Sequence, residues 1–161
     1  MTIKVGDRLP SVTLRQVTAE GPKEVTTDEF FRGKKVALFA VPGAFTPACS
    51  QRHLPGYVEK AADIRAKGVD EVACVAVNDP AVMTAWGKDQ RTEGKVTMLA
   101  DGSGDFVRAL GLELDLTKAG LGVRSKRYSM LVDNGVVKSL NIEEQPGQVT
   151  TSSADSMLRA L

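Results

Sequence analysis

Two short, continuous apolar stretches, residues 36–41 and 72–77, dominate the hydrophobic pattern of the chain. Strands buried on both faces of a sheet have this pattern, whereas half-exposed strands alternate. Between them, residues 47–67 carry apolar side chains at a spacing near 3.6, which predicts a helix that ends at Gly68. Pro55 lies inside this stretch and is expected to kink the helix or divide it in two.

Shorter and less regular patterns predict further strands, turns and helices in the rest of the chain. Residues 12–25 alternate around a turn at 20–22 and predict an N-terminal hairpin, and the Asn-Gly pair within 133–135 predicts another. Asp79 and Pro80 are the residue types expected at the cap and first position of a helix. Further strands are expected at 96–100, 128–132 and 136–141, and further helices at 27–31, 81–90, 104–110 and 153–161.

The order of these elements predicts the class of fold. Strands alternate with helices and are followed by a terminal hairpin and a helix, so we expect one α/β domain over residues 1–161 with a mixed central sheet flanked by helices. This arrangement is compatible with a thioredoxin-like fold. In α/β folds the loops at the carboxyl ends of the strands hold the active site, so the loop after residue 41 is the first candidate.

Composition narrows the classes of function. The 161 residues include 21 basic and 20 acidic side chains, a formal charge of +1, which gives no electrostatic reason to expect nucleic acid or a membrane surface as partner. No apolar run is long enough to cross a bilayer, and the N-terminal stretch lacks the apolar core of a secretory signal. We therefore expect a cytoplasmic protein.

The cysteines constrain the chemistry. Two cysteines are too few for a disulfide scaffold, and the single histidine with no close cysteine pair gives no zinc-ligand spacing. No metal or bound cofactor is expected, so chemistry at cysteine would be nucleophilic or redox. The loop after the first apolar strand contains one of the two, Cys49.

Cys49 is expected in the first turn of a helix, because Thr46 and Pro47 suit the cap and the first helical position. Free N–H groups and the helix dipole favour a thiolate there. Raising the ionised share of a thiol from about 3% to about 90% at pH 7 requires about 3.4 kcal/mol, and a helix terminus supplies only about 0.3–1 kcal/mol. A nearby cation is therefore required, and spacing alone does not say which arginine supplies it. The free N–H groups and this arginine would also donate to the leaving oxygen of a peroxide and stabilise its negative charge.

The same loop carries a family resemblance. Pro42-x-x-x-Thr46-x-x-Cys49 matches the PxxxTxxC signature of peroxiredoxins, and VPGAFTPACSQRHLPGYVEKA closely resembles the peroxiredoxin 5 or type II subfamily. The likeness continues through VNDPAVMTAWGK, residues 98–106 and RYSMLVDNGVV, and so covers essentially the whole chain. It implies a thioredoxin-like fold and a thiol-dependent peroxidase that reduces hydrogen peroxide and small organic hydroperoxides through a sulfenic acid at Cys49.

The resemblance also implies roles for individual residues. The active-site arginine of the family corresponds to Arg127, which would polarise the peroxide and stabilise the thiolate. Pro42 would shield the sulfur and Thr46 would hold the peroxide. The backbone N–H of Cys49 would bind the peroxide oxygen, next to Ala48, where relatives often have glycine.

Two residues keep open interpretations. His53 lies four residues after Cys49 on the same helical face, where it would shape the pocket, relay a proton or only pack nearby. Cys74 lies in the second apolar stretch, so we expect it to be structural rather than resolving. One branch of the family has its resolving cysteine in the segment equivalent to 148–152, which contains none here. The resemblance therefore favours an external thiol as reductant, glutathione with glutaredoxin more than thioredoxin.

The resemblance further implies a homodimer, with Phe45, Trp86 and residues 112–121 as apolar groups that would face the partner. Two other functions compete with the peroxidase. A thiol–disulfide oxidoreductase normally requires Cys-x-x-Cys, and the position three after Cys49 is Arg52. A redox sensor or holdase that passes oxidation of Cys49 to a partner protein requires the same reactive thiol, so this alternative stays open.

Overall fold

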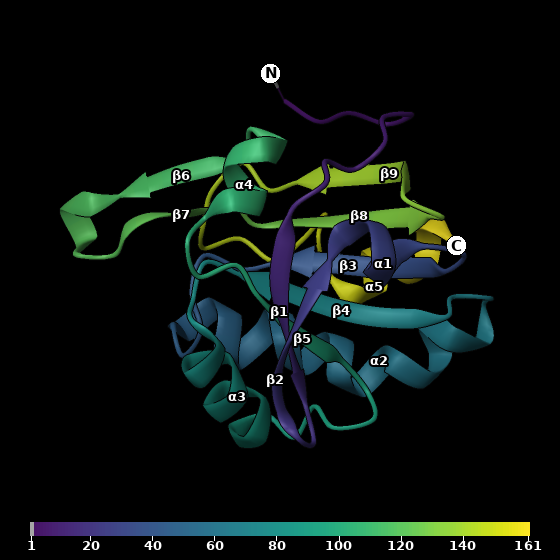
Figure 1. The fold of residues 1–161 in the computed structure, drawn as a ribbon, viewed down its shortest axis with the longest axis horizontal. Helices are drawn as coiled ribbons and strands as arrows, with labels where there is room; N and C mark the ends of the chain where they lie inside the picture. Colours follow the sequence, from purple (N-terminus) through teal and green to yellow (C-terminus); the bar gives the residue numbers. More distant parts are fainter. Residues whose placement is uncertain (1) are drawn as a thin grey trace.

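A mixed seven-stranded sheet forms the centre of the protein, which a computed structural model describes over residues 2–161 (Figure 1). Across the sheet the strands are β2 (Gly21–Thr26), β1 (Thr13–Thr18), β5 (Thr97–Ala100), β4 (Glu71–Ala76), β3 (Lys35–Ala40), β8 (Tyr128–Asp133) and β9 (Val136–Ile142). The three central strands β3, β4 and β5 are parallel, and the outer strands are antiparallel to their neighbours. The predicted mixed α/β sheet with an N-terminal hairpin is confirmed.

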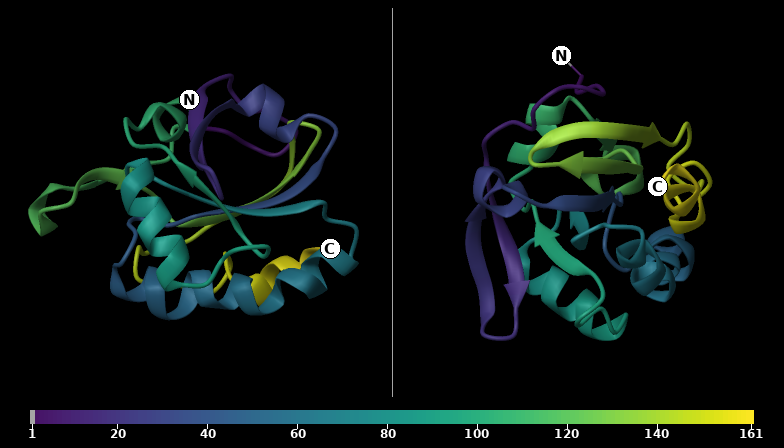
Figure 2. Two further views of the ribbon diagram at one scale, coloured as in Figure 1. Left: turned by 60° about the horizontal axis from the view of Figure 1, so that its bottom comes forward. Right: turned by 90° about the vertical axis from the view of Figure 1, so that its right-hand side faces the viewer.

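Helices cover both faces of this sheet (Figure 2). One face carries α2 (Leu54–Ala66), α3 (Pro80–Asp89) and α5 (Ala154–Ala160), and the other carries α1 (Thr27–Phe31) and α4 (Asp105–Leu110). Phe39 and Cys74 pack into the first core, whereas Leu38 and Ala73 pack into the second. Because both faces are covered, β3 and β4 are apolar at nearly every position. None of the described helices is both long and apolar enough to cross a membrane.

Local sequence signals set several of the boundaries. The Val82 N–H donates a hydrogen bond to Asp79 Oδ1 (2.8 Å), so Asp79 caps α3 and Pro80 takes the first helical position. Asn134 and Gly135 have φ values of 49° and 82°, the left-handed conformations that a tight turn between β8 and β9 requires. Both predictions are confirmed.

The predicted helix of residues 47–67 is divided, as Pro55 indicates. A π-helical turn, Cys49–His53, leads into α2, and the Leu54 N–H donates to the Cys49 carbonyl across this wider turn. Pro55 follows at the start of α2 and has no N–H to donate to the preceding turn, so the regular ladder is interrupted here. As a result, Cys49 and His53 lie at the two ends of one π-helical turn.

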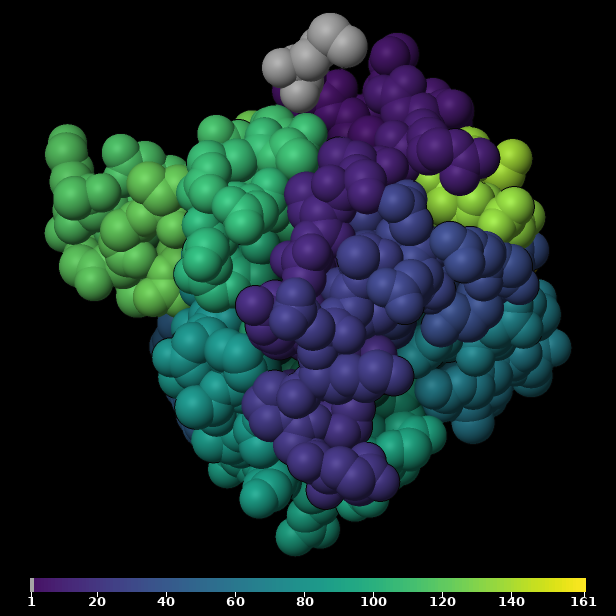
Figure 3. Space-filling model, in the orientation of Figure 1, coloured from purple at the N-terminus to yellow at the C-terminus, as the bar shows by residue number. Residues whose placement is uncertain are grey.

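A second, two-stranded sheet was not predicted. β6 (Glu113–Leu116) and β7 (Gly122–Ser125) pair in antiparallel fashion around a 3₁₀ turn, Thr117–Ala119, and the hairpin projects from the body of the protein (Figure 3). Each strand has only four residues, which is too short for its alternation to stand out from a loop.

Candidate active site

The loop that follows β3 leads directly into the helical turn that carries Cys49. The Ala44 N–H donates to Asn78 Oδ1 (2.9 Å), which ties this loop to the segment after β4. Phe45 has a φ of 64°, a left-handed conformation that is uncommon for a bulky residue. The Ser50 N–H then donates to the Thr46 carbonyl (2.9 Å) and opens the helix. The structure therefore places Cys49 in the first helical turn, as predicted.

Thr46 takes the cap position and Pro47 the first helical position, as predicted, but the Thr46 side chain does not make the capping hydrogen bond. Its hydroxyl donates to the Gly43 carbonyl (2.7 Å) and does not accept a helical N–H. The tight turn through Phe45 brings the Gly43 carbonyl within reach of the hydroxyl. Because its proton is committed to Gly43, the hydroxyl presents lone pairs to its surroundings. Among residues 2–161, no group accepts the N–H of Cys49, as expected for the first turn of a helix.

Arg127 contacts the sulfur of Cys49 directly. Its Nη2 donates to Cys49 Sγ (3.1 Å), and the exposed fractions of the two residues are 2% and 0%. Arg127 immediately precedes β8, and β8 pairs with β3 so that Tyr128 lies opposite Ala40. This register brings the arginine to the loop after β3. The contact gives the sulfur a charged hydrogen-bond donor.

His53 accepts a hydrogen bond from the same guanidinium. Its Nδ1 lies 2.9 Å from Arg127 Nη1, and its Nε2 lies 3.0 Å from the Ser152 carbonyl oxygen. A guanidinium only donates and a carbonyl only accepts, so Nε2 carries the proton and Nδ1 is the acceptor. Burial and the charge of Arg127 lower the pKa of His53 to about 3. At neutral pH His53 is therefore neutral, and both of its ring nitrogens are engaged, by Arg127 and by Ser152, which favours a role in holding the arginine over a proton relay.

Two backbone carbonyls of the C-terminal loop complete the surroundings of these side chains. The Pro146 carbonyl accepts a hydrogen bond from Arg127 Nε (3.0 Å). The Ser152 carbonyl accepts from His53 and also from Tyr57 Oη (2.9 Å). Every residue has a carbonyl, so no side-chain type marked these two in the sequence. With Nε, Nη1 and Nη2 all directed at fixed acceptors, the guanidinium is held in one orientation.

The second cysteine lies in the core beneath this site. Cys74 is fully buried in β4, opposite Phe39 of β3. Burial, with a further contribution from Cys49, raises the pKa of the Cys74 thiol well above its usual value. These surroundings favour the structural interpretation of Cys74, because a resolving thiol must ionise and reach the oxidised sulfur.

The other predicted residues form no hydrogen bond to the sulfur. Pro42 is buried in the loop after β3, and Ala48 is half-buried just before the π-helical turn. Trp86 was expected to face a partner, but it is fully buried in the core, where its Nε1 donates to Ser50 Oγ (3.0 Å). Arg124, which the sequence did not single out, donates to the carbonyls of Leu121 (2.7 Å) and Val77 (3.2 Å).

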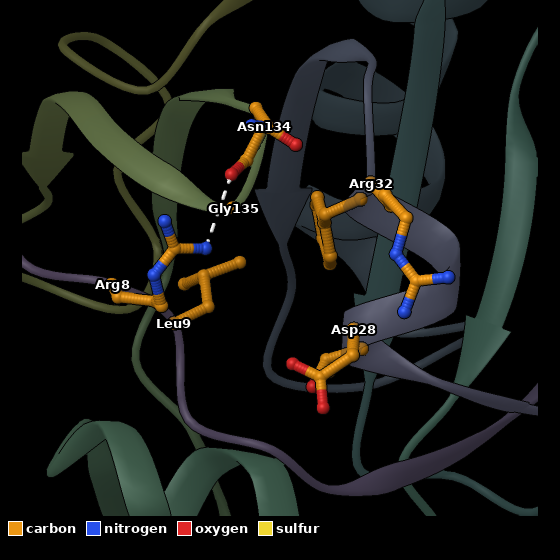
Figure 4. Close-up of a pocket in the computed structure, with 8 residues that line it drawn as sticks. Arg8, Leu9, Asp28, Arg32, Asn134 and Gly135 are labelled. Carbon is orange, nitrogen blue, oxygen red and sulfur yellow. Dashed lines mark hydrogen bonds between the residues drawn. The ribbon is translucent and has the colours of Figure 1, made fainter.

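One of two surface cavities lies beside these side chains. It has a volume of about 300 Å³ and is lined in part by Arg127, Glu143 and Pro146. The other, of about 240 Å³, is bordered by Arg8, Asp28 and other residues at the amino end of β3 (Figure 4). It contains none of the residues predicted to be functional. The carboxyl end of β3 therefore remains the place where the reactive groups meet.

A cysteine in the first turn of a helix, beside a buried arginine and at the edge of a mixed α/β sheet, is typical of one class of protein, the thiol-dependent redox enzymes. The Redoxin family profile matches residues 4–158. Peroxiredoxin-2E, chloroplastic, from Arabidopsis thaliana is 53% identical over 164 residues, which span 99% of this chain and 70% of that protein. Peroxiredoxin-2B from the same organism is 48% identical over 160 residues, 99% of this chain and 98% of that protein.

Solved structures agree with these relatives. Reduced Prx3 from Vibrio vulnificus in complex with H2O2 superposes with a TM-score of 0.93 at 51% identity and 99% coverage of both chains. Peroxiredoxin 5 from Alvinella pompejana has a TM-score of 0.86 at 39% identity, covering 98% of this chain and 97% of that chain. The chain belongs to the peroxiredoxin family. It has the thioredoxin-like fold and the thiol peroxidase activity of that family.

Proposed function

We propose that Cys49 is the nucleophile of this peroxidase and that Arg127 activates both the sulfur and the peroxide. The observation that carries this proposal is the buried Arg127 Nη2–Cys49 Sγ contact of 3.1 Å. The thiolate attacks one peroxide oxygen and the O–O bond breaks. The sulfur becomes a sulfenic acid, and the other oxygen leaves as water or an alcohol after taking up a proton.

The surrounding groups have complementary tasks in this step. The lone pairs of the Thr46 hydroxyl accept the O–H of the peroxide, since its own proton is directed at Gly43. The Cys49 N–H and the guanidinium donate to peroxide oxygens and stabilise the negative charge that develops on the leaving one. Pro42 is buried in the same loop, where its ring excludes water from the sulfur. The capture of H2O2 by Prx3 from Vibrio vulnificus supports the same substrate here, together with small alkyl hydroperoxides.

Replacement of each cysteine tests the assignment of the nucleophile. We expect Cys49→Ser to abolish catalytic peroxide consumption, because a serine hydroxyl is not ionised at neutral pH. Cys74→Ala is the matched control and retains most of the rate when glutathione and glutaredoxin are supplied. Stopped-flow measurement of peroxide consumption distinguishes them. Wild-type rates in Cys49→Ser would remove this residue from the mechanism.

An external thiol is proposed to return the sulfenic acid to the thiol. The supporting observations are the burial of Cys74 and the absence of cysteine from residues 148–152. Because Cys49 is 0% exposed, the π-helical turn must open before a bulky thiol reaches its sulfur. Glutathione would form a mixed disulfide with Cys49, and glutaredoxin would then reduce it, a route we favour over direct reduction by thioredoxin.

Mass spectrometry after one equivalent of peroxide tests this route. With glutathione present, we expect the mass of a Cys49–glutathione disulfide, and turnover that rises on addition of glutaredoxin more than of thioredoxin. An intramolecular Cys49–Cys74 disulfide would contradict the proposal. A single oxidation without turnover, whichever thiol is supplied, would favour the alternative function as a sensor or holdase.

The chain is also proposed to form a homodimer through the surface beside this site. Phe45 is 53% exposed in the active-site loop and Val123 is 51% exposed on the projecting hairpin. Arg124 Nη1 would lie 3.2 Å from a Cβ at Gly43, so the hairpin and the active-site loop are neighbours. We expect Phe45→Lys to shift a dimer toward monomer in sedimentation velocity, whereas Val5→Lys, at another exposed apolar residue, does not. A wild-type protein that sediments as a monomer would contradict this proposal.

A further inference from the structure

Glu143 is a buried carboxylate just outside the group of residues that contacts Cys49. It follows β9 and is 7% exposed. Its backbone N–H donates to the Arg127 carbonyl (2.9 Å), so the backbones of the two residues are adjacent. Within the described residues its carboxylate forms no ion pair with a basic side chain. A buried carboxylate without a cation must obtain its stabilisation from hydrogen-bond donors.

All of those donors come from one short segment, Thr150–Ser152. Thr150 supplies its N–H (2.8 Å) and its hydroxyl (2.9 Å). Ser152 likewise supplies its N–H (2.8 Å) and its hydroxyl (2.5 Å). Burial opposes the charged form, but these four bonds outweigh it and lower the pKa of Glu143. The carboxylate thus holds residues 150–152 of the C-terminal loop in one conformation through these hydrogen bonds.

The loop folded in this way is the one that holds the active-site arginine. Its Pro146 carbonyl accepts from Arg127 Nε (3.0 Å), and its Ser152 carbonyl accepts from His53 Nε2 (3.0 Å). Ser152 therefore uses its N–H and hydroxyl to bind Glu143 while its carbonyl fixes the imidazole that accepts from Arg127. A displacement of this residue would be transmitted to the guanidinium through His53.

We propose that Glu143 is a positioning residue for peroxide reduction: its carboxylate shapes the loop of residues 143–152 so that the loop carbonyls direct Arg127 at the sulfur of Cys49. This inference rests on the proposed roles of Cys49 and Arg127. Glu143 itself touches neither the sulfur nor the peroxide. It acts only through the loop. If Glu143 had only a structural role in anchoring the C-terminal helix, its replacement would leave the geometry of Arg127 and His53 unchanged.

Three variants test the effect on rate. Glu143→Ala removes both carboxylate oxygens and with them all four hydrogen bonds. We expect the second-order rate constant for H2O2 to fall by about 10- to 100-fold, because small displacements of catalytic groups have effects of this size. Glu143→Gln keeps a carbonyl oxygen for the loop N–H groups and restores most of the rate. Glu144→Ala changes the adjacent exposed carboxylate and should have no effect. Circular dichroism establishes that each variant is folded.

The single histidine of the chain provides a readout that is independent of activity. In the wild type, long-range ¹H–¹⁵N spectra should show one neutral tautomer with the proton on Nε2 at pH 7. In Glu143→Ala we expect exchange between tautomers and titration near the ordinary histidine range. If Glu143→Ala does not fold, Ser152→Ala, which removes one donor and keeps the carboxylate, replaces it and should show smaller changes in the same direction.

The outcomes separate this inference from the proposed function. A folded Glu143→Ala protein with a wild-type histidine spectrum or a wild-type rate would overturn the positioning role. In an Arg127→Ala background, Glu143→Ala should cause no further loss of rate, because the loop acts through the Arg127 side chain. A further loss as large as in the wild type would also overturn the positioning role. Peroxide reduction by Cys49→Ser, in contrast, would overturn the proposed function whatever the histidine spectrum shows.

Discussion

The neutral state of His53 makes the stability of the protein sensitive to mild acid. Burial and the nearby Arg127 charge lower the pKa of His53 to about 3, against about 6.5 in an unfolded chain. Between these values the unfolded state binds a proton that the native state does not. The contribution of His53 to stability is therefore complete only well above pH 6.5 and is lost progressively as the pH falls toward the native pKa of about 3.

The size of this effect follows from the two pKa values. At pH 7 the unfolded histidine is about one-quarter protonated, so the linked loss of stability is small. At pH 5 it is almost fully protonated while native His53 remains neutral. Acidification from pH 7 to pH 5 should thus lower the free energy of unfolding by about 2 kcal/mol through this residue alone.

Urea denaturation of the wild type and His53→Gln measures this contribution. Glutamine has one acceptor and one donor, as the neutral imidazole does, and it does not titrate. Carboxylates that titrate below pH 5, such as Glu143, affect both proteins equally, so the difference in their pH dependence isolates His53. We expect the wild type to lose about 2 kcal/mol more than the variant between pH 7 and pH 5. Equal losses would refute the neutral, buried state of the imidazole.

Substitutions at three further positions test separate parts of the structure. Thr46→Val should lower the rate of the peroxide step by about 10²-fold because it removes the hydroxyl, while Thr46→Ser should keep most of it; equal stopped-flow rates would exclude a role for the hydroxyl. Arg127→Ala should slow the same step by about 10²- to 10³-fold, and Arg127→Lys should recover only part of the loss because an ammonium lacks the planar fork; full recovery would show that charge alone suffices. Asp79→Ala should lower the free energy of unfolding by about 1 kcal/mol in urea and leave the peroxide rate unchanged.

The elements that the sequence predicted are those specified by local chemistry. β3 and β4 stand out as apolar runs because both of their faces are covered. The turn at Asn134 and Gly135 requires residues that tolerate positive φ, and Asp79 is a side-chain cap. In each case the residue type and its immediate neighbours carry the information, so no knowledge of the tertiary structure is needed.

The site was only partly accessible from the sequence. The position of Cys49 at a helix start follows from local signals, but the arginine beside it was selected by resemblance, because only the pairing of β8 with β3 brings Arg127 there. The direction of the Thr46 hydroxyl depends on the turn at Gly43, which propensities do not specify. Glu143 was missed entirely. Its contacts depend on how the loop of residues 143–152 folds back onto it, which the sequence does not show. An acidic residue after a strand is ordinarily exposed to solvent, so nothing marked this one.

The arrangement of charges explains why the buried carboxylate is placed behind the loop and not against the arginine. Arg127 meets a carbonyl at Nε and a neutral imidazole at Nη1, and in the described part of the chain it forms no ion pair with a carboxylate. A carboxylate in direct contact would compete with the sulfur for the guanidinium and weaken the stabilisation of the thiolate. A protonated His53 would instead repel Arg127. Neutral contacts therefore hold the guanidinium in place while leaving its full charge available to Cys49, and Glu143 fixes those contacts from one layer further away.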